Sequence, residues 1–188
     1  MGIIHFEDTF SQRLQFYSNP DTLTEPVFHV DIHYEDTVKS IRTSLIAESD
    51  TLEFYPLYMR SHSSLLILQV MEQRGNWYRV CTDDIYKITH WVYLEGEVLE
   101  SWREFLPTVS TVSPAVRTNR LRRNPTDKAQ EYNVNTEMLC LRVVHVNGDW
   151  LKVRNDPDYC SAKFIIEEEF EGFLRWREGE DVLIFFTP

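Results

Sequence analysis

The amino-acid sequence predicts a mainly β protein in which one small unit is used twice. The first observation is an internal repeat, because Gly75-Asn76-Trp77-Tyr78-Arg79-Val80 returns 73 positions later as Gly148-Asp149-Trp150-Leu151-Lys152-Val153. The second is that an apolar, β-rich run precedes each copy, Leu65 to Met71 in one and Met138 to Val146 in the other. The third is that many aromatic residues fall inside strand patterns. Self-similarity of this length indicates a repeated structural unit.

Residues 1–45 are expected to form a distinct N-terminal extension without a counterpart in the repeat. From Val27 to Tyr34, apolar and aromatic residues alternate with polar ones, which predicts a strand with one buried face. Asn19-Pro20-Asp21 predicts a turn before that strand. The stretch from Asp8 to Tyr17 is compatible with a short helix or with a strand. The extension is therefore expected to contain β structure.

Residues 46–105 are expected to form the first unit. Its centre is a predicted hairpin whose turn contains Gly75, a residue that suits a turn position with positive φ. Apolar residues at helical spacing predict a short helix over residues 97–105. The expected strands are Leu65 to Met71, Trp77 to Thr82 and Thr89 to Leu94.

Residues 106–114 are expected to be a linker, and residues 115–188 the second unit. Pro107 and Pro114 bound a polar, β-branched stretch, a composition typical of an extended and fairly stiff connector. The second unit has about nine more residues than the first between the Trp strand and the strand that follows it. That insertion carries the acidic run Glu167-Glu168-Glu169.

Three stretches of the second unit follow the pattern of a known family. Asn119-Arg120-Leu121-Arg122-Arg123-Asn124-Pro125 is similar to a Leu-x-Val-Arg-x-Gly-Pro element, with Asn124 in the place of the usual glycine. Asn is the next-best residue at a left-handed turn position. Gly148 to Val153 is similar to a Gly-x-Trp-x-x-Val hairpin, and Gly172-Phe173-Leu174 to a Gly-Trp-Val strand. These residues resemble the bacterial SH3-like (Src-homology-type) β-barrel family.

The first unit shows the same resemblance with one departure. Trp77, Val80 and Trp91-Val92 match the pattern, whereas Thr51 to Pro56 departs from its first element. The resemblance covers about residues 46–188 and implies two tandem SH3-like β-barrels behind the N-terminal extension. It also implies binding rather than catalysis, often of cell-wall peptides or proline-containing segments. Such domains are commonly attached to cell-wall peptidases, and no such enzyme domain is attached to these units in this sequence.

Trp77 and Trp150 occupy equivalent hairpin positions and are the leading candidates for a ligand site. In SH3-like barrels an aromatic residue there lines a groove, and aromatic grooves accept extended or proline-rich peptides. The alternative is a tryptophan of the core. Both interpretations stay open, because Trp is seldom fully buried. The predicted ligand-binding residues are Trp77, Tyr78, Trp91, Tyr93, Trp150 and Trp176.

Charge and hydropathy exclude several partners. The chain has 188 residues and a net charge of −11, whereas affinity for nucleic acid rests on clustered Lys and Arg. Four arginines, Arg117, Arg120, Arg122 and Arg123, fall within seven positions; such a cluster can hold a phosphate, but we interpret it as a solvated loop that neutralises nearby acidic surface. No apolar run is long enough for a spanning helix. The N-terminus lacks the features of a signal peptide, which predicts a cytoplasmic protein, or a periplasmic or cell-envelope protein if an export signal has been removed.

The sequence predicts no cofactor and no metal. The three cysteines, Cys81, Cys140 and Cys160, are an odd number without zinc-site spacing. We expect Cys81 and Cys140 to be small core residues, which fits a reducing compartment. Neighbouring side chains on the polar strand face of His29, Asp31, His33 and Glu35 are about 6 to 7 Å apart, so four residues on one strand cannot converge on a single ion, and we interpret them as a solvated strand face.

No catalytic motif is visible. There is no Gly-x-Ser-x-Gly, the cysteines lack a telling neighbour, and six glycines leave little room for a phosphate loop. We therefore predict a non-catalytic binding protein that uses tandem SH3-like barrels for protein or peptide interaction. The alternatives are a cell-wall peptide-binding module after export, an acidic inhibitor or immunity-type protein that docks on a basic enzyme, and an unrecognised hydrolase.

Overall fold

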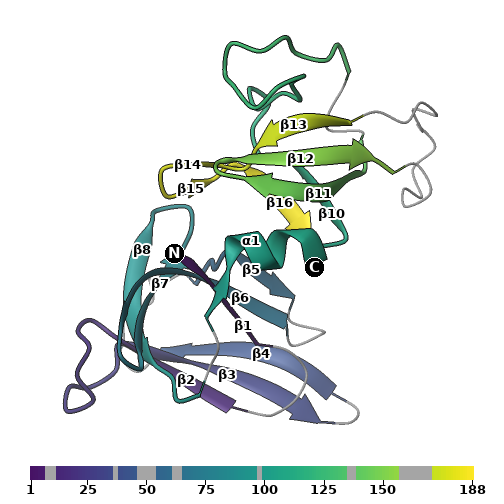
Figure 1. The fold of residues 1–188 in the computed structure, drawn as a ribbon. Helices are drawn as coiled ribbons and strands as arrows, with labels where there is room; N and C mark the ends of the chain where they lie inside the picture. Colours follow the sequence, from purple (N-terminus) through teal and green to yellow (C-terminus); the bar gives the residue numbers. More distant parts are fainter. Residues whose placement is uncertain are drawn as a thin grey trace. The chain divides into compact units, whose positions relative to one another are not determined.

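The computed structural model describes residues 1–6, 12–35, 38–45, 54–60, 65–96, 99–134, 139–156 and 171–188, with the backbone alone at 33–35 and 38–45. The chain divides into two compact units, Met1–Trp102 and Arg103–Pro188. Antiparallel sheets dominate both units, and the described part of the chain has one short α-helix, α1 (Trp102–Phe105) (Figure 1). The prediction of a mainly β protein is confirmed.

Unit 1 contains one antiparallel sheet of nine strands. Eight follow the order β4-β3-β2-β8-β7-β6-β1-β9, and β5 pairs with β6 beside this path. The strands are β1 (Gly2–Phe6), β2 (Gln12–Tyr17), β3 (Phe28–Glu35), β4 (Val38–Leu45), β5 (Tyr58–Arg60), β6 (Leu65–Arg74), β7 (Trp77–Asp83), β8 (Ile88–Tyr93) and β9 (Glu100–Ser101).

Unit 2 contains a five-stranded antiparallel sheet in the order β13-β12-β11-β10-β16 and a separate two-stranded ribbon, β14-β15. A short 3-10 helix, η2, precedes the first strand. The elements are η2 (Leu106–Thr108), β10 (Thr111–Pro114), β11 (Leu141–Asn147), β12 (Trp150–Asn155), β13 (Glu171–Arg175), β14 (Arg177–Glu178), β15 (Asp181–Val182) and β16 (Ile184–Thr187).

The two sheets share one strand order. The path β8-β7-β6-β1-β9 of unit 1 corresponds to β13-β12-β11-β10-β16 of unit 2. The hairpins at the centre turn on Gly75 with φ 60° and Gly148 with φ 58°, a conformation that glycine adopts without steric cost. The repeat seen in the sequence therefore corresponds to two copies of one topology. Within the described residues neither copy closes into a barrel.

The structural repeat begins earlier than the sequence indicated. Tyr17 of β2 pairs with Trp91 of β8, and Arg122 pairs with Phe173 of β13 in the same way. The main-chain amide of Val27 donates to Phe16 O over 2.7 Å, as that of Tyr132 donates to Leu121 O over 2.9 Å. Residues 12–27 thus have a counterpart in residues 117–132, whereas the sequence pattern had placed all of residues 1–45 outside the repeat.

The turns after these two elements are also alike. Asn19-Pro20 and Asn124-Pro125 occupy the same position, and in each turn the amide two residues after the Asn donates to the Asn carbonyl over 2.8 Å. Asn124 does not have a positive φ; among the described non-glycine residues only Lys87 does. The offset between copies is 105 positions at this turn and 73 at the hairpin, so unit 1 has 32 additional residues. They include β3, β4 and β5.

Residues 106–114, expected as a linker, lie within unit 2. β10 pairs with β16 from Thr111 to Pro114, and Val112 is buried at 1% exposure. The alternation of polar and apolar residues explains why this stretch forms a strand of the sheet instead of an extended connector. The helix expected over 97–105 is confined to α1 and follows β9; residues 97–98 lie outside the described residues.

Each unit has its own buried residues. In unit 1 one face of the sheet forms a core around the stacked rings of Phe16 and Phe28, whose centroids are 4.5 Å apart. In unit 2 Leu121 crosses β13 so closely that a Cβ on Gly172 would lie 2.8 Å from Leu121 Cγ. The buried apolar residues of unit 2 include Val112, Leu121, Leu141, Leu151, Val153, Leu174, Trp176, Ile184 and Phe186.

Candidate ligand-binding pocket

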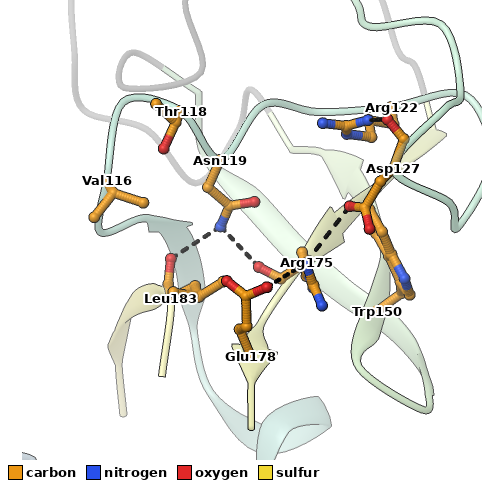
Figure 2. Close-up of a pocket in the computed structure, with 9 residues that line it drawn as sticks. All are labelled: Val116, Thr118, Asn119, Arg122, Asp127, Trp150, Arg175, Glu178 and Leu183. Atoms are coloured by element: carbon orange, nitrogen blue, oxygen red, sulfur yellow. Dashed lines mark hydrogen bonds and ion pairs between the residues drawn. The ribbon is translucent and has the colours of Figure 1, made fainter. Parts of the chain in front are cut away.

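A pocket of about 210 Å³ lies within unit 2 beside Trp150 (Figure 2). Its walls come from the segment that follows β10, from the start of β12, and from the end of β13 with the β14-β15 ribbon. Apolar walls and charged side chains thus face the same small space, which is typical of a site that orients a ligand. The lining residues are Val116, Thr118, Asn119, Arg122, Asp127, Trp150, Arg175, Glu178 and Leu183.

Asn119 presents a fixed hydrogen-bond acceptor to this pocket. Its Nδ2 donates to the main-chain oxygens of Arg175 over 2.7 Å and Leu183 over 2.9 Å. Both amide N–H groups are thereby used, which fixes the orientation of the side-chain amide. Asn119 is 8% exposed, and its Oδ1 accepts no hydrogen bond from the described residues. Figure 2 shows Oδ1 turned away from the two carbonyls, toward the inside of the pocket.

Arg175 presents unused donors on the opposite side. Its Nη1 lies 3.1 Å from Glu178 Oε1 and 3.6 Å from Asp127 Oδ1. Its Nε is buried without a partner, and no hydrogen bond of its Nη2 is found in the described residues. The guanidinium edge formed by Nε and Nη2 is therefore unpaired. Both carboxylates are 65% exposed, so each ion pair is weak and exchanges easily with solvent.

Arg122 covers the Trp150 side of the pocket. Its guanidinium lies 5.9 Å from the Trp150 ring centroid, within the range of a cation–π contact. Its Nη1 donates to the carbonyl of Asp127, and its Nη2 lies 3.5 Å from Glu131 Oε1. The main chain of Arg122 exchanges two hydrogen bonds with Phe173, of 2.8 and 2.7 Å. Arg122 thus holds the loop that carries Asp127 against the sheet.

Two other arginines of the basic cluster, Arg120 and Arg123, also contact neighbouring side chains. Arg120 Nε lies 3.7 Å from Glu131 Oε2, and the guanidinium of Arg123 lies 4.7 Å from the Tyr132 ring centroid. The described contacts of Arg120, Arg122 and Arg123 are therefore with neighbouring acidic, carbonyl and aromatic groups.

The corresponding position in unit 1 is filled by aromatic rings. Trp77 packs edge to face against Tyr17 and Tyr93, with both pairs of centroids 5.3 Å apart. The Tyr93 hydroxyl donates to Glu95 over 2.8 Å. On the same side of the sheet the guanidinium of Arg74 lies 4.9 Å from the Trp91 ring centroid.

The structure brings one of the six predicted ligand-binding residues to the pocket, namely Trp150. Tyr78 packs in the core of unit 1. Trp91 and Trp176 are also buried, at 6% and 2% exposure, and Trp176 Nε1 donates to Gly148 O over 2.8 Å. Tyr93 is exposed. Trp77 is half-buried and lies in its aromatic cluster in unit 1.

Sequence reasoning missed the two residues that present unpaired groups to the pocket. Asn119 belongs to the stretch that resembles the first family element, but an Asn in a polar loop gives no signal of its own. Arg175 lies opposite Trp150 in the register of β12 and β13. That cross-strand position is predictable once the hairpin register is known.

The described residues contain no cluster of three or more potential metal-ligating side chains. Arg13 holds Asp31 through two contacts, of 2.6 and 3.2 Å, and His29 Nε2 lies 3.4 Å from Asp31. The side chains of His33 and Glu35 lie outside what the structure describes.

The two described cysteines differ. Cys81 is a free, buried thiol whose pKa is raised to about 11, mainly by burial and then by the charge of Asp84. It is thus protonated at neutral pH and a poor nucleophile. Cys140, expected as a free core residue, is disulfide-bonded. The acidic run Glu167-Glu168-Glu169 lies outside the described residues.

The described part of the chain has no helix with the length and hydrophobicity of a transmembrane span. Comparisons of the chain with models of protein families, with curated proteins and with solved structures found no match.

Proposed function

We propose that the chain is a non-catalytic binding protein made of two SH3-like units, and that unit 2 binds a peptide segment of a partner protein. The observation that carries this proposal is the pocket beside Trp150, in which a half-buried aromatic ring borders unpaired polar groups. Aromatic side chains are among the groups that receive extended, proline-rich peptides, and Trp150 supplies such a side chain to this pocket.

The SH3-like assignment is supported by how the elements of unit 2 pair. The stretch from Asn119 to Pro125, similar to the first element of the family, pairs at Arg122 with Phe173 of the Gly172-Phe173-Leu174 strand. The hairpin that carries Trp150 continues the same sheet. The three stretches of unit 2 that are similar to elements of the SH3-like family are thus neighbours in the structure, although they are far apart in the sequence.

A peptide suits this site better than a reacting substrate. Trp150 and Arg175 stand on paired strands and the amide of Asn119 is held at both N–H groups, so these residues lose little conformational entropy on binding. The carboxylates around the pocket are already paired with arginines. No described nucleophile lies among the lining residues except the hydroxyl of Thr118, and no described histidine lines the pocket.

The test is selection of a random peptide library displayed on phage against the full chain. Selected peptides are expected to bind saturably, and Trp150→Leu is expected to weaken their affinity at least about tenfold, because the ring is the largest apolar wall. Trp77→Leu, which changes the same motif in unit 1, is the matched control and is expected to leave the affinity unchanged. Melting curves establish that both variants are folded. Failure to select any peptide, or binding that is indifferent to Trp150→Leu, contradicts the proposal.

A further inference from the structure

The pocket in unit 2 holds one unpaired acceptor and one unpaired donor edge, and their chemistry identifies the group that they recognise. Resting on the proposed peptide-binding function, we propose that the pocket binds a single neutral peptide group. Asn119 Oδ1 accepts the N–H of that group, and the Nε–Nη2 edge of Arg175 donates to its C=O.

The acceptor half follows from the amide of Asn119. Its two N–H groups are held by the main-chain oxygens of Arg175 and Leu183, so the amide cannot exchange its oxygen and nitrogen without losing both bonds. Oδ1 is not among the buried polar atoms of the described residues that lack a partner, so it is open to the solvent or the ligand in the pocket. Oδ1 faces the pocket (Figure 2) and can only accept. The bound group must therefore bring an N–H or an O–H.

The donor half follows from the guanidinium of Arg175. Nη1 alone is shared by Asp127 and Glu178, which leaves the edge of Nε and Nη2 for a ligand. Nε is buried without a partner, and the proposal requires the guanidinium to turn so that the whole edge meets the ligand. The two exposed carboxylates permit this rotation because such pairs contribute little. Because guanidinium N–H groups only donate, the bound group must also bring an acceptor oxygen.

The charges around the pocket favour a neutral group. A carboxylate on Arg175 would meet the carboxylates of Asp127 and Glu178, and an ammonium at Asn119 would meet the guanidinium groups of Arg122 and Arg175. An amide offers the required donor and acceptor without a net charge. Because a peptide repeats this group along its backbone, one amide can be taken at the pocket while its neighbour packs against the Trp150 ring.

The experiment uses two small probes and the full chain. N-acetylglycine N-methylamide contains two peptide groups, and N-acetylsarcosine N,N-dimethylamide has the same carbonyls but no N–H. Each is titrated into ¹⁵N-labelled protein, and the side-chain signals of Asn119, Arg175 and Trp150 are followed by NMR. The first probe is expected to shift these signals saturably. The second is expected to bind about tenfold more weakly, because Asn119 Oδ1 then loses its donor.

The protein donor is tested by Arg175→Lys. Lysine keeps a positive charge for Asp127 and Glu178 but removes the planar donor edge. The affinity for N-acetylglycine N-methylamide is expected to fall about tenfold. Arg142→Lys is the matched control, because Arg142 is an exposed arginine of the same sheet that pairs with Asp156 over 3.3 Å and does not line the pocket. It is expected to leave the affinity unchanged.

The outcomes separate this inference from the proposed function. Equal binding of the two probes, no effect of Arg175→Lys, or no saturable shift below about 100 mM overturns the peptide-group proposal. If library peptides need Trp150 but bind equally well to the Arg175→Lys protein, and the two probes also bind equally, the proposed function stands and this inference is overturned. If the first probe binds as expected and no library peptide is selected, the peptide-group site stands and the proposed function fails.

Discussion

Trp77 and Trp150 share a hairpin motif, a strand order and a cross-strand position, but they lie in different surroundings. In unit 1, Tyr17 and Tyr93 flank Trp77. In unit 2, the same two register positions around Trp150 are held by Arg122 and Arg175. The two copies therefore share a backbone arrangement, but the residues that flank the tryptophan are tyrosines in unit 1 and arginines in unit 2.

The difference shows how one backbone gives either a packed cluster or an open pocket. Aromatic neighbours bury each other's edges and faces, so Trp77 needs nothing further. An arginine can lie over a ring, as Arg122 does at 5.9 Å from the Trp150 centroid, but its guanidinium also needs acceptors. In unit 2 these acceptors are Asp127, Glu178 and Glu131. Holding two arginines apart with acids leaves space beside Trp150.

The largest expected effect is a difference in stability between the alanine variants of the two tryptophans. Trp77→Ala is expected to lower the free energy of unfolding by about 3 kcal/mol, because the ring loses two aromatic contacts and leaves a cavity. Trp150→Ala is expected to cost only about 1 kcal/mol, because one side of its ring faces the pocket. Urea denaturation of the two variants measures both losses. Equal losses would show that the two environments do not differ in packing.

The next effect concerns the strand crossing that holds Arg122 in place. Gly172→Ala is expected to cost about 2 kcal/mol, because the new methyl would lie 2.8 Å from Leu121 Cγ. Thermal or urea denaturation measures this loss. In a Leu121→Ala background the atoms in conflict are absent, so the same substitution is expected to cost little. Additive losses in this double-mutant cycle would mean that the two residues do not meet.

A substitution at Arg175 is expected to make the surroundings of Trp150 similar to those of Trp77. Arg175→Tyr gives Trp150 the neighbour that Trp77 has in Tyr93, and the new ring is expected to fill the pocket. Stability is expected to change by no more than about 1 kcal/mol, because an aromatic pair replaces two exposed ion pairs. Binding of N-acetylglycine N-methylamide, followed by NMR, is expected to be lost. Retained binding would show that the pocket does not depend on Arg175.

The smallest effect is a pH dependence carried by unit 1. Gly172 corresponds in unit 1 to His90, whose ring packs edge to face with Phe28 at 5.2 Å and whose Nδ1 lies 2.8 Å from the Thr82 hydroxyl. Burial lowers the pKa of His90, so the unfolded chain binds the proton more readily.

The stability contributed by His90 is therefore present above the ordinary histidine pKa of about 6.5 and is lost as the pH falls below it. Urea denaturation on both sides of this pH measures the dependence. His90→Gln is expected to show a shallower pH dependence than the unchanged chain. An identical slope in the two proteins would assign the effect to other groups.

Much of the fold was predictable because strands and tight turns have local signatures. The alternation from Val27 to Tyr34 predicted β3, and the two hairpins follow from their glycines and apolar runs. The counterpart of residues 12–27 in unit 2 was not predictable from residue identity. Phe16 and Leu121 are equivalent only in burial and main-chain bonding, and apart from Asn-Pro their surroundings differ in sequence.

The candidate site was predictable at one residue. Trp150 was evident from the repeated motif, because a half-buried aromatic on a hairpin arm is a common recognition element. Asn119 and Arg175 are brought to it by pairing across 56 positions of chain, which no local pattern contains. Tyr78 illustrates the opposite error, since alternation along a strand places every second residue on the core face.

The 32 additional residues of unit 1 have an evolutionary consequence. They enter between Val27 and Leu65, and β3 and β4 attach outside β2 at the margin of the sheet. Strands at a margin use main-chain groups that no inner strand needs, so the register of the shared strands is the same with or without them. After a duplication, one copy can thus enlarge its core while the other stays compact. Specialisation of either copy then requires only a few surface-facing substitutions, without a change of topology.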